Sequence, residues 1–133
     1  FLKLSPLPAF FSEPIFKSEF LKIIGALLVL LSQILLAFTL IHFQKSLRFG
    51  LNSANTGKLV TTGIFSISRN PFFLSLNIYF LGTAIYKPSI FFMAITFAAI
   101  IAIHFFILKE EKFMKENYGN EYKKYTKKVR RYI

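Results

Sequence analysis

Three apolar segments, separated by polar or proline-containing stretches, dominate this chain. The first, residues 23–43, carries no formal charge, and its 21 residues would rise about 31 Å as a helix, close to the hydrocarbon thickness of a bilayer. Gln33 lies near its middle, where an amide usually faces another helix. We therefore predict a membrane span over residues 20–43, with Gln33 packed against a neighbouring helix or, alternatively, in contact with a ligand.

The other two apolar segments lie together in residues 71–107, which contain a single lysine. A Lys-Pro pair at 87–88 divides them into arms of 71–86 and 88–107, and proline suits the first turn of a new helix. We predict a tight helical hairpin whose first arm is short for a straight span. The second arm keeps its helical pattern to Gly119, a C-cap candidate, so its last turns should project into water.

Polar or irregular stretches make up the rest of the chain. Three prolines interrupt residues 1–18, so this lead-in cannot be one continuous helix. Residues 44–70 form a connection too long for a hairpin turn, and long connections are often functional. Residues 108–133 form a basic, Tyr-rich tail. The sequence predicts an all-α, multi-pass transmembrane protein with about three spans, folded as a single domain over residues 1–133.

Composition and charge placement agree with this prediction. The chain has 133 residues, of which 54% are hydrophobic and 18 are Phe, too apolar for a soluble domain of this size. The net charge of +11 by itself also suits nucleic-acid binding. However, 13 of the 17 Lys and Arg lie in 44–70 and 108–133, which three spans place on one side. This positive-inside pattern predicts that both segments are cytosolic, with the lipid bilayer as partner and no nucleic acid.

Two polar clusters face this predicted cytosolic side. The first reads LVTTGIFSISRNPFF over residues 59–73, and the second occupies residues 109–131. Arg69 precedes one apolar helix, and Glu110 and Glu111 follow another. Ionisable residues at the membrane boundary often mark functional sites, although a snorkelling Arg and an ordinary solvated helix end would explain the same residues. Cys is absent, which removes thiolate ligands and nucleophiles, and no metal site is predicted.

The first cluster resembles the L-V-T-x-G-x-[YF]-x-x-x-R-[HN]-P-x-[YF] signature of isoprenylcysteine carboxyl methyltransferases and their prokaryotic relatives. Phospholipid N-methyltransferases share much of this pattern. The second cluster is similar as well, with Glu-Glu after an apolar span, then Y-G-x-x-Y-x-x-Y and a V-x-R ending. Order and spacing agree over about residues 20–133. Asn70 stands where the eukaryotic enzymes have His, and Phe73 replaces a common Tyr, which leaves the acceptor open.

This resemblance implies a multi-pass membrane methyltransferase that uses S-adenosylmethionine. Its acceptor would be a lipid-like or apolar small molecule, methylated at the membrane–cytosol interface. The resemblance also implies a prokaryotic inner (plasma) membrane location and at least one further transmembrane helix before Phe1. A homo-oligomer stays open, because Gly25, Ala26 and Ser32 permit close helix contacts.

The chemistry of that cofactor assigns roles to the ionisable residues of the motifs. Arg69 can pair with the cofactor carboxylate, and Glu110 or Glu111 can accept hydrogen bonds from its ammonium or ribose hydroxyls. Arg69 and Glu110 are the two residues expected to be needed for catalysis. No general base is assigned, since a carboxylate acceptor requires none. Positioning and desolvation would supply most of the rate.

Smaller and neutral residues complete the predicted cofactor site. Gly63 and the backbone of residues 59–64 can approach adenine closely, because Gly has no side chain. His104 lies seven residues before Glu111, so the two share a helix face. The predicted cofactor-binding residues are Leu59, Val60, Gly63, Ile64, Arg69, Asn70, His104, Glu110, Glu111 and Tyr122.

Two other functions remain open from the sequence. A non-enzymatic small membrane protein or subunit would bind no such cofactor. A membrane reductase of the sterol-reductase type would bind a nicotinamide cofactor, although such enzymes are larger and have more spans.

Overall fold

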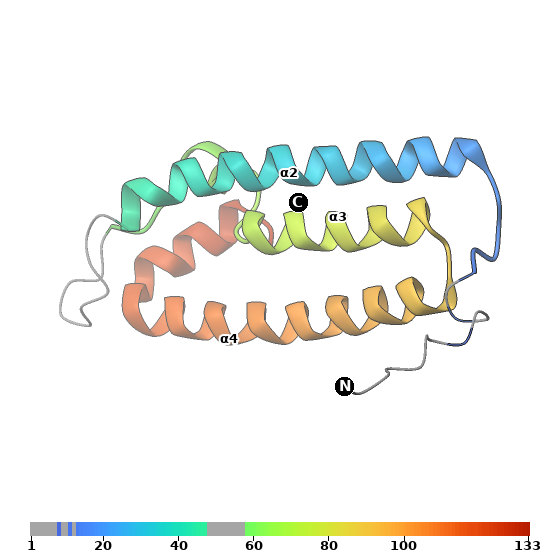
Figure 1. Ribbon diagram of the computed structural model, residues 1–133. Coiled ribbons are helices and arrows are strands. Elements are labelled where there is room, and N and C mark those ends of the chain that lie inside the picture. Colours follow the sequence, from blue (N-terminus) through green and yellow to red (C-terminus); the bar gives the residue numbers. More distant parts are fainter. Residues whose placement is uncertain (1–7, 9–10, 12, 48–57) are drawn as a thin grey trace, which may run out of the picture.

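The computed structural model describes residues 8, 11, 13–47 and 58–133, with side chains described outside 44–47. Its elements are α2 (Glu19–Leu47), the short 3-10 helix η1 (Gly63–Ser66), α3 (Pro71–Tyr86) and α4 (Ile90–Lys128). Consecutive long helices run antiparallel as neighbours (Figure 1). This part of the chain contains no strand, and the predicted all-α fold is confirmed.

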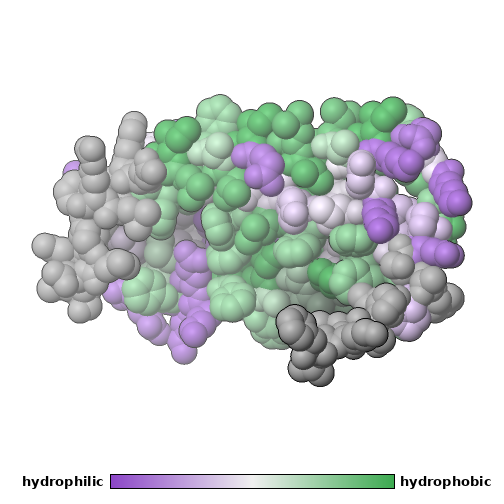
Figure 2. Space-filling view, viewed as in Figure 1, coloured by the Kyte–Doolittle hydropathy of each residue, from purple (hydrophilic) through white to green (hydrophobic). Residues whose placement is uncertain are grey.

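The lengths of the helices agree with a membrane protein. Residues Glu19–Phe43 of α2 and helix α4 are long and apolar enough to cross a membrane, and α3 is a shorter apolar helix. The helix α3 has the predicted bounds. Helix α4 begins two residues after Pro88, because the Ser89 side chain caps it by accepting a hydrogen bond from the Phe92 N–H at 3.4 Å. Hydrophobic residues cover much of the middle of one face, with hydrophilic ones mainly toward its two ends (Figure 2).

Small residues bring α2 and α3 into close contact. Gly25, Ser32 and Thr39 are buried on α2 at intervals of seven residues, which places them on one helix face. A Cβ atom on Gly25 would overlap the backbone N of Tyr86 on α3, so only glycine permits this approach. Gln33 is exposed, because it adjoins this face instead of lying on it. The expectation that Gln33 packs against another helix is therefore wrong within the described residues.

We predict that Gly25→Val destabilises the bundle by about 2 kcal/mol, because the added carbons overpack the contact with α3. Thermal unfolding of the detergent-solubilised protein measures the change. Ala26→Val is the matched control, since Ala26 is exposed on the same helix. Equal stability of the two variants would contradict the close contact.

The chain turns back on itself after Gly119. This residue has φ +49° and ψ −118°, which interrupts α4, and residues 120–128 continue as a second helical stretch. In Figure 1 this stretch runs back from the kink toward the start of α3. We call residues 120–133 the fold-back segment. The break therefore lies at Gly119, where the sequence indicated a helix end. The tail beyond it continues as a helical stretch that is folded back onto the bundle.

A small core holds the fold-back segment in place. Tyr122, Tyr125 and Val129 are buried against Leu59 of the connection, with Met114 and Tyr118 packed beside them. The connection, the end of α4 and the fold-back segment therefore meet at one end of the bundle, which we call the polar end. It carries the residues that the sequence motifs singled out.

Candidate functional site

Hydrogen bonds attach the turn before α3 to the fold-back segment. The Arg69 N–H donates to the Arg130 carbonyl at 3.1 Å, and the Ser68 hydroxyl donates to the Arg131 carbonyl at 3.4 Å. The Tyr125 hydroxyl donates to the Phe65 carbonyl at 2.5 Å. Two sequence motifs about 60 residues apart are thereby brought together.

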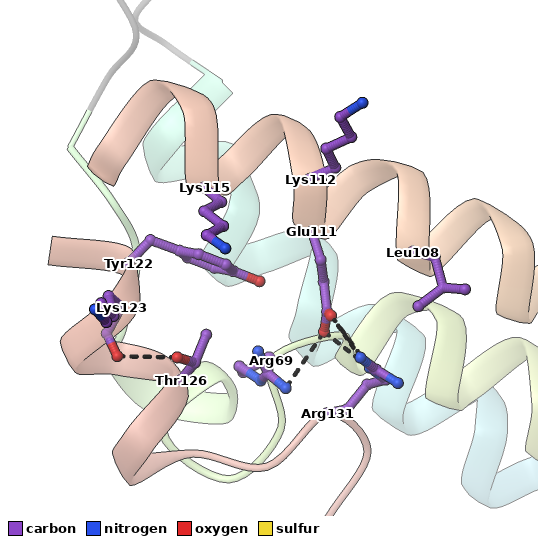
Figure 3. Close-up of a pocket in the computed structure, with 9 residues that line it drawn as sticks. All are labelled: Arg69, Leu108, Glu111, Lys112, Lys115, Tyr122, Lys123, Thr126 and Arg131. Atoms are coloured by element: carbon purple, nitrogen blue, oxygen red, sulfur yellow. Dashed lines mark hydrogen bonds and ion pairs between the residues drawn. The ribbon is translucent and has the colours of Figure 1, made fainter. Parts of the chain in front are cut away.

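Glu111 is the centre of the ionic network at the polar end (Figure 3). Arg131 donates two hydrogen bonds to the Glu111 carboxylate, with Nε 3.1 Å from Oε1 and Nη2 2.9 Å from Oε2. Arg69 Nη2 lies 3.4 Å from Oε1, and the Asn70 amide donates to the same oxygen at 3.3 Å. The Arg69 and Glu111 side chains are only 12% and 13% exposed, so their charges are largely removed from water.

A cavity of about 280 Å³, here called the central cavity, lies between the connection, α4 and the fold-back segment. Seven of the ten predicted cofactor-binding residues line it: Leu59, Val60, Arg69, Asn70, Glu110, Glu111 and Tyr122. Its other walls are mainly aromatic or apolar and consist of Phe43, Lys58, Phe65, Phe113, Met114, Tyr118 and Tyr125. The cavity therefore combines one Arg and two carboxylates with aromatic surfaces.

The other three predicted residues lie elsewhere among the described contacts. Gly63 has φ +62° and faces the His42 ring, which a Cβ atom would overlap. The Ile64 carbonyl accepts the Ile67 N–H at 3.2 Å within the 3-10 turn. His104 Nδ1 lies 3.0 Å from the hydroxyl of Tyr132, at the end of the fold-back segment. Neither Gly63 nor Ile64 nor His104 lines the central cavity.

Local electrostatics distinguish the two carboxylates. Although Glu110 is exposed as a whole residue, partial burial of its carboxyl group, and then the charge of Glu111, raise its pKa. Glu111 is instead engaged by Arg131, Asn70 and Arg69. Glu110 makes no ion pair in the described part of the chain, so it is the carboxylate that is open to a ligand.

Two tyrosines of the cavity, Tyr122 and Tyr125, remain hydrogen-bond donors at neutral pH. Burial, and then the neighbouring Tyr122, raise the pKa of Tyr125 to about 12. Burial, followed by the charge of Glu111, also raises the pKa of Tyr122. Both hydroxyls therefore stay protonated, and neither serves as a phenolate base.

An apolar groove of about 360 Å³ adjoins the central cavity between α2 and the start of α3. The groove and the cavity share Phe43, Phe65, Arg69, Asn70 and Glu110. The rest of the groove is mostly apolar and is formed by Thr39, Leu40, Pro71, Phe72 and Phe73. A molecule with an apolar tail can therefore reach Arg69 and Glu110 from the side of the helices.

Sequence reasoning gave no role to Arg131, the strongest partner of Glu111, or to Lys58 of the cavity wall. The signal for Arg131 was present in the V-x-R ending, which marks a position without saying what it contacts. No local pattern shows that the tail returns to Glu111. That contact depends on the break at Gly119.

An all-helical bundle with two apolar helices of membrane-spanning length, and with a charged cavity at one end, has the architecture of a helical membrane protein. The phospholipid methyltransferase family model matches residues 20–121, and the chain belongs to this family of membrane methyltransferases. Neither the curated proteins nor the solved structures gave a match.

Proposed function

We propose that this protein transfers a methyl group from S-adenosylmethionine to a lipid-like or apolar small molecule at the membrane–cytosol interface. The observation that carries the proposal is the central cavity, where Arg69 and Glu110 share one aromatic-lined space that adjoins an apolar groove. Membership of the phospholipid methyltransferase family supports the reaction class. The basic residues at the polar end support a cytosolic orientation for it.

The donor set of the central cavity suits this cofactor. Arg69 Nε is buried and has no hydrogen-bond partner among the described residues, so its N–H is free to donate to a carboxylate. The Glu110 carboxylate can accept from the ammonium or from ribose hydroxyls. Aromatic faces such as Tyr118 and Tyr122 can pack on adenine and attract a sulfonium.

The residues of this chain would act by holding and shielding the reactants. When bound, the cofactor supplies a methyl group on a sulfonium, which needs no metal to activate it. Arg69 and Glu110 would fix its two charged ends. Glu111 is a positioning residue, since Arg131 and Asn70 hold it beside Arg69. Tyr122 and Tyr125 of the fold-back segment would exclude water from the cavity.

The acceptor would enter through the apolar groove between α2 and α3. Leu40, Phe72 and Phe73 can contact an apolar tail, while the reacting end reaches Arg69, which lines both spaces. A groove of about 360 Å³ falls within the range of about 300–1,000 Å³ typical of small-molecule sites. This arrangement favours a substrate that is delivered by the bilayer.

The direct test is binding of S-adenosylhomocysteine to the detergent-purified full chain, measured by calorimetry. Transfer of a labelled methyl group from S-adenosylmethionine to a membrane lipid extract then tests the reaction. We expect saturable binding of S-adenosylhomocysteine and no binding of NADPH. Absence of any S-adenosylhomocysteine binding would refute the proposal, and binding of NADPH instead would favour a reductase.

The raised pKa of Glu110 predicts that cofactor affinity falls with acidification. As the pH falls through this raised pKa, the carboxylate takes up a proton and loses its attraction for the ammonium. We expect affinity for S-adenosylhomocysteine to fall, by up to about tenfold, as the pH is lowered from neutrality through the pKa of Glu110. Glu110→Gln should bind weakly at every pH in this range. A variant that keeps the wild-type pH dependence would assign the effect to another group.

A further inference from the structure

A second hollow at the polar end is strongly basic. It has a volume of about 490 Å³ and adjoins the central cavity, with Arg69, Glu111 and Tyr122 lining both. Its walls contain five cationic side chains and one carboxylate (Figure 3): Arg69, Lys112, Lys115, Lys123 and Arg131, with Glu111. We call it the basic hollow.

The positive charge in the basic hollow is only partly neutralised. Glu111 is gripped by Arg131 at 2.9 Å and lies 3.4 Å from Arg69, so one carboxylate serves two guanidinium groups. Lys112, Lys115 and Lys123 make no ion pair within the described part of the chain. Several like charges around one hollow repel one another, which favours binding of a multivalent anion.

We propose that the basic hollow binds a phosphate group, carried either by a bilayer lipid or by a free ion. Phosphate offers several acceptor oxygens and more than one negative charge, which suits a hollow that is lined by both guanidinium and ammonium groups. In Figure 3, Lys115 points from α4 toward Tyr122, while Lys112 extends away from Arg69 at the rim. The hydroxyls of Tyr122 and Thr126 add neutral polar groups to the wall.

The cations of the basic hollow come from two parts of the chain, so a bound anion would connect these parts. Lys112 and Lys115 come from α4 before the break at Gly119, whereas Lys123 and Arg131 belong to the fold-back segment. A phosphate between them would replace repulsion by attraction and hold the fold-back segment over the central cavity. The apolar Leu108 also lines the hollow, which puts it near the end of the apolar part of α4. This inference does not rest on the proposed function, because phosphate binding needs no methyl donor.

The test measures hydrogen–deuterium exchange of residues 120–133 and the melting temperature of the full-length protein. One arm adds inorganic phosphate, against chloride at equal ionic strength, to protein in maltoside micelles. The other compares vesicles containing phosphatidylglycerol with vesicles of phosphatidylcholine alone. Protection in the first arm identifies free phosphate as sufficient, and protection only by phosphatidylglycerol identifies a lipid headgroup. Absence of protection in both arms would overturn the proposal.

Matched variants separate the site from general basicity. Changing Lys112, Lys115 and Lys123 together to Gln should weaken, at least tenfold, the affinity for the phosphate or phosphatidylglycerol that protects residues 120–133 from exchange. Changing Lys124, Lys127 and Lys128 together to Gln removes the same charge from exposed positions outside the basic hollow, and should alter it less than twofold. An equal loss in the two triple variants would mean non-specific attraction and would also overturn the proposal.

Discussion

Replacing Arg69 with Gln is expected to weaken binding of S-adenosylhomocysteine by about 100-fold or more. Arg69 lines the central cavity, and its Nε has no partner among the described residues. Two charge-assisted hydrogen bonds to a carboxylate contribute about 3 kcal/mol, which corresponds to about two powers of ten in affinity. Calorimetry on the detergent-purified protein measures the change.

Two further variants make this result interpretable. Arg130→Gln removes the same charge from an exposed neighbour of the site, and we expect it to bind like the wild type, because only its backbone carbonyl contacts Arg69. Arg69→Lys keeps the charge but lacks the planar guanidinium group. Its affinity for S-adenosylhomocysteine should therefore lie between that of Arg69→Gln and that of the wild type. Undiminished binding by Arg69→Gln, with an unchanged melting temperature, would remove Arg69 from the cofactor site.

Replacing Glu111 with Gln is expected to destabilise the polar end by about 3 kcal/mol, because it leaves a largely buried Arg69 without its counter-charge. The same change weakens the bidentate contact that ties Arg131, near the end of the fold-back segment, to α4. We expect faster tryptic cleavage within residues 120–133 and a lower melting temperature. Cofactor affinity should fall as well, since Tyr122 and Tyr125 leave the cavity wall when the segment opens.

Glu116→Gln is the matched control for this prediction. Glu116 is an exposed residue of α4 and makes no ion pair within the described chain, so its loss should change the melting temperature little. If Glu111→Gln behaved like Glu116→Gln in both cleavage and melting, the network around Glu111 would not hold the fold-back segment.

Most of the fold-back segment, which completes the contacts of the site, lies outside the region that the family model matches. The match ends at residue 121, whereas Arg131 and Val129 lie beyond it and complete the contacts of Glu111 and Leu59. Arg69 and Glu110 therefore lie within the matched region, but Tyr122 and part of what positions these residues come from the following 12 residues. Variants of this segment should accordingly affect cofactor binding through the stability of the polar end.

The helices and their order follow from the sequence alone. An uncharged apolar segment of membrane length and a Lys-Pro break are local signals, and they predicted α2, the bounds of α3 and the hairpin. The spacing of the two motifs placed Arg69, Asn70, Glu110 and Glu111 on the same side, because three spans leave no other arrangement of the connections. These residues are found together around the central cavity.

Only the tertiary structure decided which of these residues contact one another and which line the cavity. Arg131 contacts Glu111 and Asn70 across separations of 20 and 61 residues, and no periodicity within one helix encodes such contacts. Gly63 has a positive φ and lies against the His42 ring, and His104 contacts the hydroxyl of Tyr132. Neither residue therefore lines the central cavity, in which the sequence had placed both. The physical reason is the break at Gly119, which lets buried tyrosines and a charged tail return to the bundle and close the site.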